Sequence, residues 1–194
     1  RARAGKSRVE MQEELRSSQQ QVGITTVFVP HDQEEALTMS DTILLMNDGH
    51  IEQWDDPWTM YNKPASVFAS GFIGKANILN GKLADQNGAL KVEGPGWSFK
   101  VDEKENFKPG DAVTMAIRGE HFCIHPEPGP ETVSFKIKDT VFTGNVYKIN
   151  GFIGPDEVQL VVLNSNEAGY APGQELAVSA NPQYIHYYAR LETI

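Results

Sequence analysis

The hydrophobic and polar positions of the chain follow two different patterns, and the change falls near Gly74. Before this residue, helical spacings of apolar residues alternate with short runs that are apolar at nearly every position. After it, short alternating segments are separated by Gly, Pro, Asn and Asp, which is typical of an antiparallel sandwich or small barrel. The pattern predicts an α/β part over residues 1–74 and an all-β domain over residues 75–194.

The first part has the order of a helix, a strand, a second helix and a second strand. A helix beginning near Val9 is expected to end at Gly23, which suits a helix C-cap. Residues 24–29 and 41–46 are apolar on both faces, as the strands of a buried parallel sheet are. The second helix begins after Asp32. Strand, helix and strand over about thirty residues predict a βαβ unit.

Turn and helix signals complete this part. Asn47-Asp48-Gly49 predicts a tight hairpin turn into a strand that ends at Trp54. Asp56-Pro57 suits the start of a short helix, and a second short helix is expected over residues 65–71.

The second part is predicted to consist of short strands at 78–83, 89–92, 98–101, 112–118, 133–143, 145–149, 157–163 and 175–180. Asn80-Gly81-Lys82 and Gly144 are expected to form hairpin turns.

Charge and composition exclude several classes of function. The 194 residues contain 17 Lys and Arg against 26 Asp and Glu, a net charge of −9, which argues against a nucleic-acid-binding protein. No apolar run approaches the roughly 20 residues that span a bilayer, and the chain begins without the apolar segment of a signal peptide. Cys123 is the single cysteine, so an internal disulfide is excluded. We expect a soluble, intracellular protein.

His31 is the main candidate for a catalytic or ligand-binding residue. It follows a predicted buried strand and precedes a helix, at the edge of an α/β sheet where ligands bind. Its position alone leaves a structural role and a ligand-binding role both open. Trp54, Trp58 and Tyr61 are interpreted as core or interface residues rather than as a platform for stacking bases.

His121, Cys123 and His125 alternate along the chain and would share one face of a strand. A metal site there is conceivable, but no acidic partner is clearly placed, so we predict no metal site. Cys123 has no neighbouring base at the spacing that a nucleophile requires, which argues against covalent catalysis.

The segment from Thr26 to Leu37 closely resembles the switch-histidine loop of ATP-binding cassette (ABC) transporter ATPases of the importer class. Four further stretches are similar to the same family: Arg8–Leu15, Ser40–Gln53, Tyr61–Gly74 and Met115–Ile124. The resemblance implies the ATP-binding subunit of a polyamine, sugar or iron importer. Residues 1–74 would be the C-terminal part of its P-loop ATPase domain, and residues 75–194 an oligonucleotide-fold-like (OB-like) barrel of the transport-associated (TOBE) regulatory type.

This resemblance implies roles and partners. His31 would contact the γ-phosphate of ATP, with Mg²⁺ as the metal of the intact subunit. The subunit would form a homodimer on the inner face of the cell membrane, beneath transmembrane permease subunits served by a solute-binding protein. It would bind no nucleic acid. Polyamines or similar organic cations are the solutes that we favour.

The chain departs from the family pattern in several places. It lacks a Walker A loop, the Leu-Ser-Gly-Gly-Gln signature and a Walker B strand. Gly5-Lys6-Ser7 resembles only the tail of a Walker A loop, and Pro30 stands where relatives carry Thr or Ser. We therefore predict that this chain alone neither hydrolyses ATP nor holds a cofactor.

Two other functions are considered. The chain could act as a free-standing regulatory module whose β domain binds a small anion, a solute or a protein. An oligonucleotide-binding role rests on fold analogy alone and disagrees with the acidic charge. In addition, the apolar strands Ile24–Val29 and Ile43–Met46 predict a surface that a second copy of the chain covers.

Overall fold

The computed structural model describes residues 2–164 and 169–190, and the chain divides into two compact units. Unit 1 comprises residues 1–65 and unit 2 comprises residues 66–194. The division falls before the short helix α4 (Val67–Phe72) rather than at Gly74, because α4 packs with strands of unit 2. Its Ser70 hydroxyl lies 3.0 Å from the hydroxyl of Tyr188.

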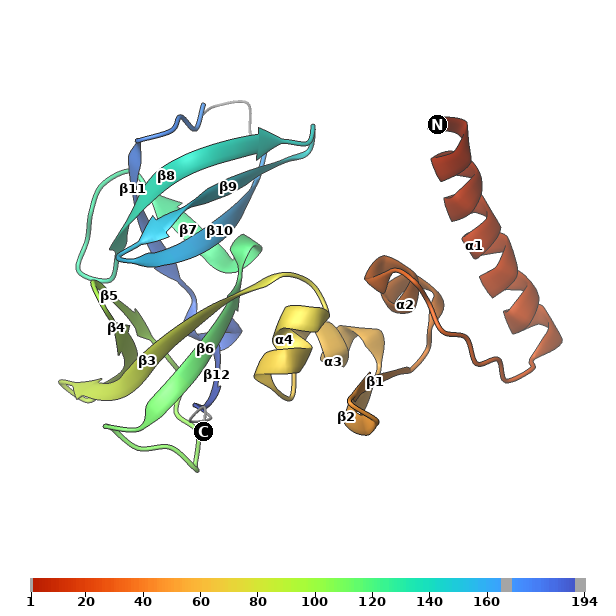
Figure 1. Cartoon of the computed structure of the whole chain (residues 1–194), viewed down its shortest axis with the longest axis horizontal. Helices are drawn as coiled ribbons and strands as arrows, with labels where there is room; N and C mark the ends of the chain where they lie inside the picture. The colour runs from red at the N-terminus through yellow and green to blue at the C-terminus, as the bar shows by residue number, and fades with distance from the viewer. Residues whose placement is uncertain (1, 165–168, 191–194) are drawn as a thin grey trace. The chain divides into compact units, whose positions relative to one another are not determined.

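Unit 1 contains three helices and one hairpin (Figure 1). They are α1 (Ala2–Val22), α2 (Gln33–Met39), β1 (Ile43–Asn47), β2 (His50–Asp55) and α3 (Pro57–Asn62). β1 and β2 pair antiparallel, and the turn between them uses positive φ angles at Asp48 (48°) and Gly49 (79°). These two angles fit a type I′ turn, which confirms the predicted hairpin.

Two polar side chains hold the end of unit 1 together. Asp56 caps α3 by accepting hydrogen bonds from the amides of Trp58 and Thr59, and the Thr59 hydroxyl lowers the pKa of this carboxyl. The buried side chain of Gln53 donates to the carbonyl of Lys63 (3.1 Å) and accepts from the amide of Ala65 (2.9 Å). Gln53 therefore fastens β2 to the segment that follows α3.

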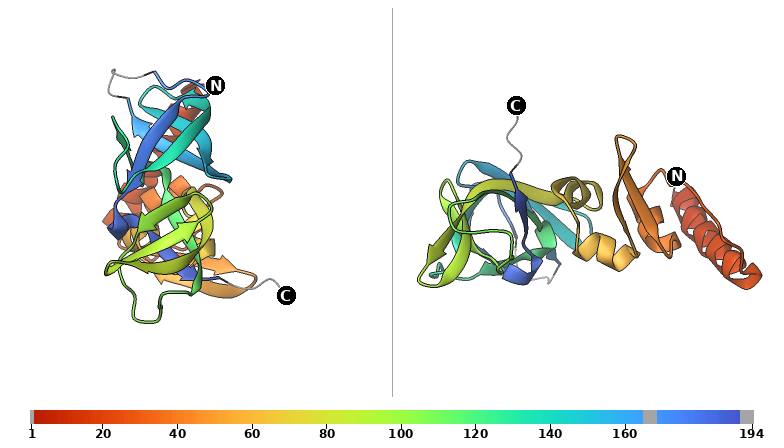
Figure 2. Two further views of the ribbon diagram at one scale, coloured as in Figure 1. Left: turned by 90° about the vertical axis from the view of Figure 1, so that its left-hand side faces the viewer. Right: turned by 90° about the horizontal axis from the view of Figure 1, so that it is seen from below.

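Unit 2 contains two five-stranded antiparallel sheets in addition to α4 (Figures 1 and 2). The first sheet has the order β12-β6-β3-β4-β5 and the second has the order β10-β9-β8-β11-β7. The first sheet consists of β3 (Ala76–Gln86), β4 (Ala89–Gly94), β5 (Trp97–Lys100), β6 (Ala112–Arg118) and β12 (His186–Ala189). The second consists of β7 (Phe122–His125), β8 (Val133–Phe142), β9 (Val146–Ile153), β10 (Asp156–Leu163) and β11 (Glu175–Ala180).

Both sheets contribute to one apolar core. Met115 and Ile117 come from the first sheet, and Phe135, Ile149 and Leu160 come from the second; all five are almost completely buried. Because the core draws on both sheets, the sheets belong to one compact unit. The prediction of an all-β second part is confirmed from Ala76 onward, and closure into an OB-like barrel stays a prediction.

The predicted hairpin turn at Asn80-Gly81-Lys82 is wrong. β3 runs straight through these residues, and the turn to β4 uses positive φ angles at Asn87 and Gly88. A side chain at position 81 would put its Cβ 2.5 Å from the carbonyl oxygen of Glu93. The glycine is required by the close approach of β4 rather than by a turn.

Asn77 links the two sheets. Its Oδ1 accepts from the amide of Gln159 (2.8 Å), and its Nδ2 donates to the carbonyls of Gln159 (2.9 Å) and Ile117 (3.2 Å). β10 is an edge strand of the second sheet, so Asn77 from β3 satisfies backbone groups that no further strand of the described residues pairs.

Replacing Asn77 with alanine is expected to destabilise unit 2 by about 2 kcal/mol, because the backbone groups of Gln159 lose their partner. Asn80→Ala is the matched control: the exposed Asn80 lies on the same strand and accepts one hydrogen bond, from Thr114. Its expected cost is below about 1 kcal/mol. Urea unfolding followed by circular dichroism measures both, and equal losses would contradict the linking role.

Candidate functional site

The segment that carries His31 connects α1 to α2. α1 ends at Val22, and the amide of the following Gly23 donates to the carbonyl of Gln19 (2.9 Å), as the C-cap prediction requires. The Gln19 side chain in turn donates to the carbonyl of Ile24 (2.6 Å). Residues 24–30 then run without helix or strand pairing to His31.

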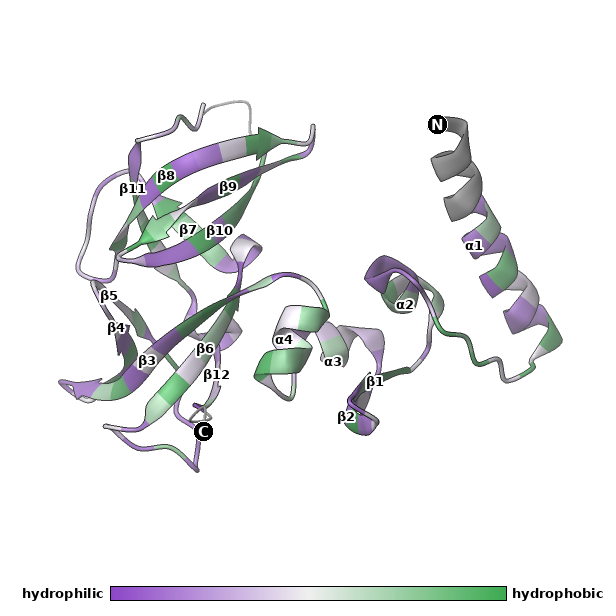
Figure 3. Ribbon diagram, in the orientation of Figure 1, coloured by the Kyte–Doolittle hydropathy of each residue, from purple (hydrophilic) through white to green (hydrophobic). Residues whose placement is uncertain are grey.

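The structure contradicts the predicted strand over residues 24–29 and, with it, the βαβ unit. β1 pairs only with β2, and within the described part of the chain residues 24–29 have no ladder partner. The side chains of Val27 and Val29 are 89% and 86% exposed, and this link is largely apolar in colour in Figure 3. A strand needs a neighbouring backbone to pair with, so apolarity alone does not create one.

α2 is positioned by its cap and by α1. Asp32 caps the helix by accepting from the amide of Glu34 (2.9 Å), which confirms the predicted helix start. Arg16 of α1 donates to the carbonyl of Thr38 (2.6 Å) and contacts the carboxylate of Asp41 (3.2 Å). These contacts fix both ends of α2 and therefore the residue that precedes it.

His31 is exposed at the start of this capped helix. Within residues 2–164 and 169–190 its imidazole has no hydrogen-bond partner, so both ring nitrogens are available to a ligand. The half-buried Pro30 precedes it and contributes no backbone donor. The structure brings no other predicted phosphate-binding residue to His31: residues 5–7 have helical backbone within α1, where a phosphate-binding loop would be irregular.

The other sequence candidates are spread over both units. Trp54 and Trp58 are 64% and 63% exposed, which excludes them from the core and leaves the interface role as a prediction. Lys63 of the same unit lies over the Trp58 ring at 5.7 Å. Tyr61 is half-buried.

His121, Cys123 and His125 do not share a strand face. His121 ends the 3₁₀ turn η1 (Gly119–His121) and stacks on Tyr184 at 4.2 Å, whereas the other two lie in β7. His125 is within 2.7 Å of the Ser179 hydroxyl, and Cys123 is exposed. No group of three or more metal-ligating side chains is found in the described residues.

Burial gives His121 a pH-dependent effect on stability. Desolvation lowers its pKa below 6.5, with opposing contributions from Glu120 and Arg118, and its Nδ1 is buried without a hydrogen-bond partner among the described residues. The unfolded state therefore takes up a proton at a higher pH than the folded state does. We expect His121 to favour folding above pH 6.5 and to lose this contribution as the pH falls below 6.5.

His121→Phe should keep the ring stack and remove the titration, so the variant should lose less stability than the unmodified chain between pH 7.5 and pH 5.5. Urea unfolding at several pH values measures the difference. Identical pH slopes for the two proteins would show that His121 does not titrate on unfolding.

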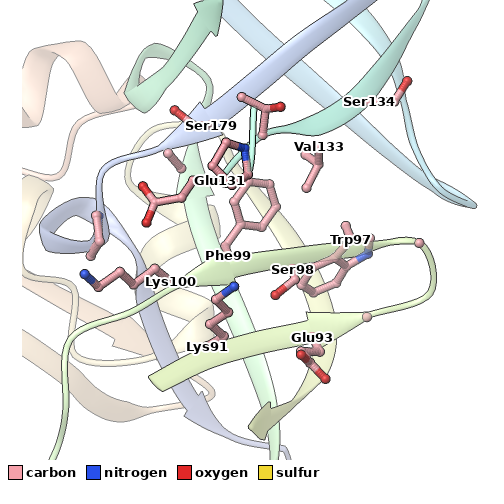
Figure 4. A pocket seen from close by; sticks show the side chains of 16 residues that line it. Lys91, Glu93, Trp97, Ser98, Phe99, Lys100, Glu131, Val133, Ser134 and Ser179 are labelled. Carbon is pink, nitrogen blue, oxygen red and sulfur yellow. The ribbon is translucent and has the colours of Figure 1, made fainter. Parts of the chain in front are cut away.

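Unit 2 contains a cavity of about 550 Å³ that the sequence analysis did not identify (Figure 4). Its walls include β4 and β5, the segment 130–134 and the end of β11. The residues involved come from four separate parts of the chain, so only the strand register brings them together. No local sequence signal could have found this site.

Comparison with known proteins identifies relatives over nearly the whole chain. The spermidine/putrescine import ATP-binding protein PotA of Acetivibrio thermocellus is 35% identical over 187 residues, which cover 96% of this chain and 51% of that protein. The PotA proteins of Oleidesulfovibrio alaskensis and Rubrobacter xylanophilus are each 37% identical and cover 90% of this chain. This chain is similar in sequence to these import ATP-binding proteins. It spans about half the length of these relatives.

The chain was also compared with protein-family models and with solved structures. No protein-family model matches the chain. Among solved structures, the cytoplasmic molybdate-binding protein ModG with molybdate bound has a TM-score of 0.48 and 11% identity, covering 59% of this chain and 96% of that protein. None of the helices in the described part of the chain is long and apolar enough to cross a membrane.

Proposed function

We propose that the chain is the C-terminal portion of the ATP-binding subunit of an ABC importer. Unit 1 would end the nucleotide-binding domain and carry the switch histidine, and unit 2 would be a TOBE-like regulatory domain with an OB-like fold. The observation that carries the proposal is the position of His31, exposed between an apolar extended segment and a capped helix, in a chain homologous to importer ATP-binding proteins. The alternative of a free-standing regulatory module is not favoured by this homology.

His31 would act through position and hydrogen bonding. Phosphoryl transfer depends mainly on positioning and charge stabilisation, and a neutral imidazole can donate from one ring nitrogen to a phosphate oxygen. The capped α2 and its contacts with Arg16 would hold the imidazole at the edge of the site. ATP and Mg²⁺ would be held mainly by residues outside this chain, and we expect neither to bind to the chain alone.

The partners follow from the same proposal. The intact subunit would form a homodimer beneath transmembrane permease subunits, on the cytoplasmic face of the membrane, and would act with a solute-binding protein. A polyamine is the solute class we favour, since the relatives are named for spermidine and putrescine. The apolar side chains exposed on 24–29 and on the hairpin, such as Leu44 and Met46, would be covered in the assembled subunit or by its second copy.

A chimera tests the proposal. The matching residues of the Acetivibrio thermocellus relative are replaced by this chain, and ATP hydrolysis by the purified chimera is measured. We expect the importer chimera to hydrolyse ATP, and calorimetry on this chain alone to detect no binding of Mg-ATP. An inactive, folded chimera would contradict the proposal, as would tight magnesium-dependent binding by the chain alone that His31→Ala abolishes.

A further inference from the structure

The strand β5 has a free edge. It is the last strand of the first sheet and, among the strands that the structure describes, pairs only with β4. The amide of Val101 donates to the carbonyl of Leu90 (3.0 Å), which lies opposite it in the register of the two strands. Because hydrogen-bonded and non-hydrogen-bonded pairs alternate in an antiparallel ladder, Ser98 and Lys100 belong to non-hydrogen-bonded pairs.

The backbone N–H and C=O groups of Ser98 and Lys100 therefore point away from β4. Within residues 2–164 and 169–190, no other group bonds to these two donors and two acceptors. Such a row of unused backbone groups is what an added strand pairs with.

The cavity of unit 2 lies beside this edge. Figure 4 shows the strand of Ser98 and Lys100 between the strand of Lys91 on one side and Val133 and Ser179 on the other. The volume of about 550 Å³ is in the range that ligand sites occupy. The free edge of β5 thus borders the cavity, whose other walls include the segment 130–134 and the end of β11.

The charges at the edge favour an acidic occupant. Lys91 and Lys100 are directly opposite each other in a non-hydrogen-bonded pair, where side chains are closest and like charges repel. Lys91 donates to the neutral amide of Gln86 (2.9 Å), and neither lysine forms an ion pair within the described part of the chain. Glu131 on the far wall and Glu93, which accepts from Gln86, are the carboxylates lining the cavity.

We propose that the free edge of β5 binds an extended, acidic segment of a partner polypeptide as an additional strand. Its backbone would use the donors and acceptors of Ser98 and Lys100. A carboxylate opposite Lys100 would extend the row of Lys91 and Lys100 and relieve their repulsion. A small anion, in contrast, would use only the N–H groups of Ser98 and Lys100 and leave their carbonyl groups unpaired. The inference goes beyond the proposed function and involves no nucleotide, so its failure would leave the ATP-binding role untouched.

Two peptides and two variants of Ser98 test whether the free edge of β5 binds an acidic strand. The two peptides are fluorescein-labelled octapeptides of alternating Thr and Val. Two central residues, on the face that would lie beside Lys100, are either both Glu or both Lys. Fluorescence anisotropy measures the binding of each peptide to the whole chain. Ser98→Pro removes an N–H that faces the cavity and not β4, whereas Ser98→Ala removes only the hydroxyl. We expect the Glu peptide to bind about tenfold more tightly than the Lys peptide, Ser98→Pro to weaken it about tenfold, and Ser98→Ala to leave it unchanged.

Lys100→Glu gives a second, independent readout, because it should reverse the preference between the two peptides without touching the backbone. This variant decides the question even if Ser98→Pro fails to fold. Absence of binding up to about 1 mM, or equal binding by Ser98→Pro and the unmodified chain, would overturn the proposal. So would a dimer that Ser98→Pro dissociates in light scattering with no peptide bound, since the occupant would then be a second copy.

Discussion

In the importer chimera, replacing His31 with alanine is expected to lower kcat for ATP hydrolysis about 100-fold, the usual cost of losing one positioned donor to a developing charge. The imidazole is exposed and unbonded within the described residues, so its removal breaks no contact that holds unit 1 together. Stability should be unchanged. KM for ATP should change much less than kcat, because a donor that acts mainly in the transition state contributes little to substrate binding.

His50→Ala is the matched control for this prediction. His50 is also exposed and also in unit 1, at the turn of the hairpin between β1 and β2, and we assign it no role in catalysis. Its replacement should leave kcat within about twofold. If both histidine variants keep full activity, His31 does not serve as the switch histidine.

Gly151→Ala is expected to destabilise unit 2 by about 3 kcal/mol, at the upper end of the cost of overpacking a core. Gly151 is buried in β9 between its two neighbouring strands, opposite Ile137 and Val158. A Cβ there would overlap the carbonyl oxygen of Lys136 and lie 2.5 Å from Cζ of the fully buried Phe135. Neither a backbone carbonyl nor a packed ring can move aside cheaply.

The control is Gly71→Ala in the same unit. Gly71 lies in α4, and no atom that could obstruct a methyl group lies within 4 Å of the position its Cβ would take. Alanine should therefore stabilise unit 2 by about 0.5 kcal/mol through its helix propensity. Chemical unfolding of both variants gives the two free energies. A loss below about 1 kcal/mol for Gly151→Ala would mean that β8 and β9 can separate to accept a methyl group.

Local signals in the sequence predicted those features whose causes are local. The caps Asp32 and Asp56 and the Asp48-Gly49 turn are fixed by bonds or angles within three residues, and each lies where the sequence places it. The four-residue strands β7 and β12 were not predicted, although β5, which is equally short, was.

Features that depend on distant partners could not be predicted in the same way. Residues 24–29 have the composition of a strand, but pairing requires another backbone beside them. Gly81 has the appearance of a turn residue, yet its cause is the approach of Glu93, twelve positions away. His31 was singled out by its position, but its role toward phosphate came only from the resemblance to a family loop. The opposition of Lys91 and Lys100 needed the strand register.

The uneven burial of the three tryptophans gives unit 2 an optical reporter of its own. Trp97 is 4% exposed in the core of unit 2, whereas Trp54 and Trp58, both in unit 1, are mostly in contact with water. A buried indole emits at shorter wavelengths than a hydrated one, so a red shift on unfolding should arise almost entirely from Trp97. Tryptophan emission can therefore follow the unfolding of unit 2 without any label.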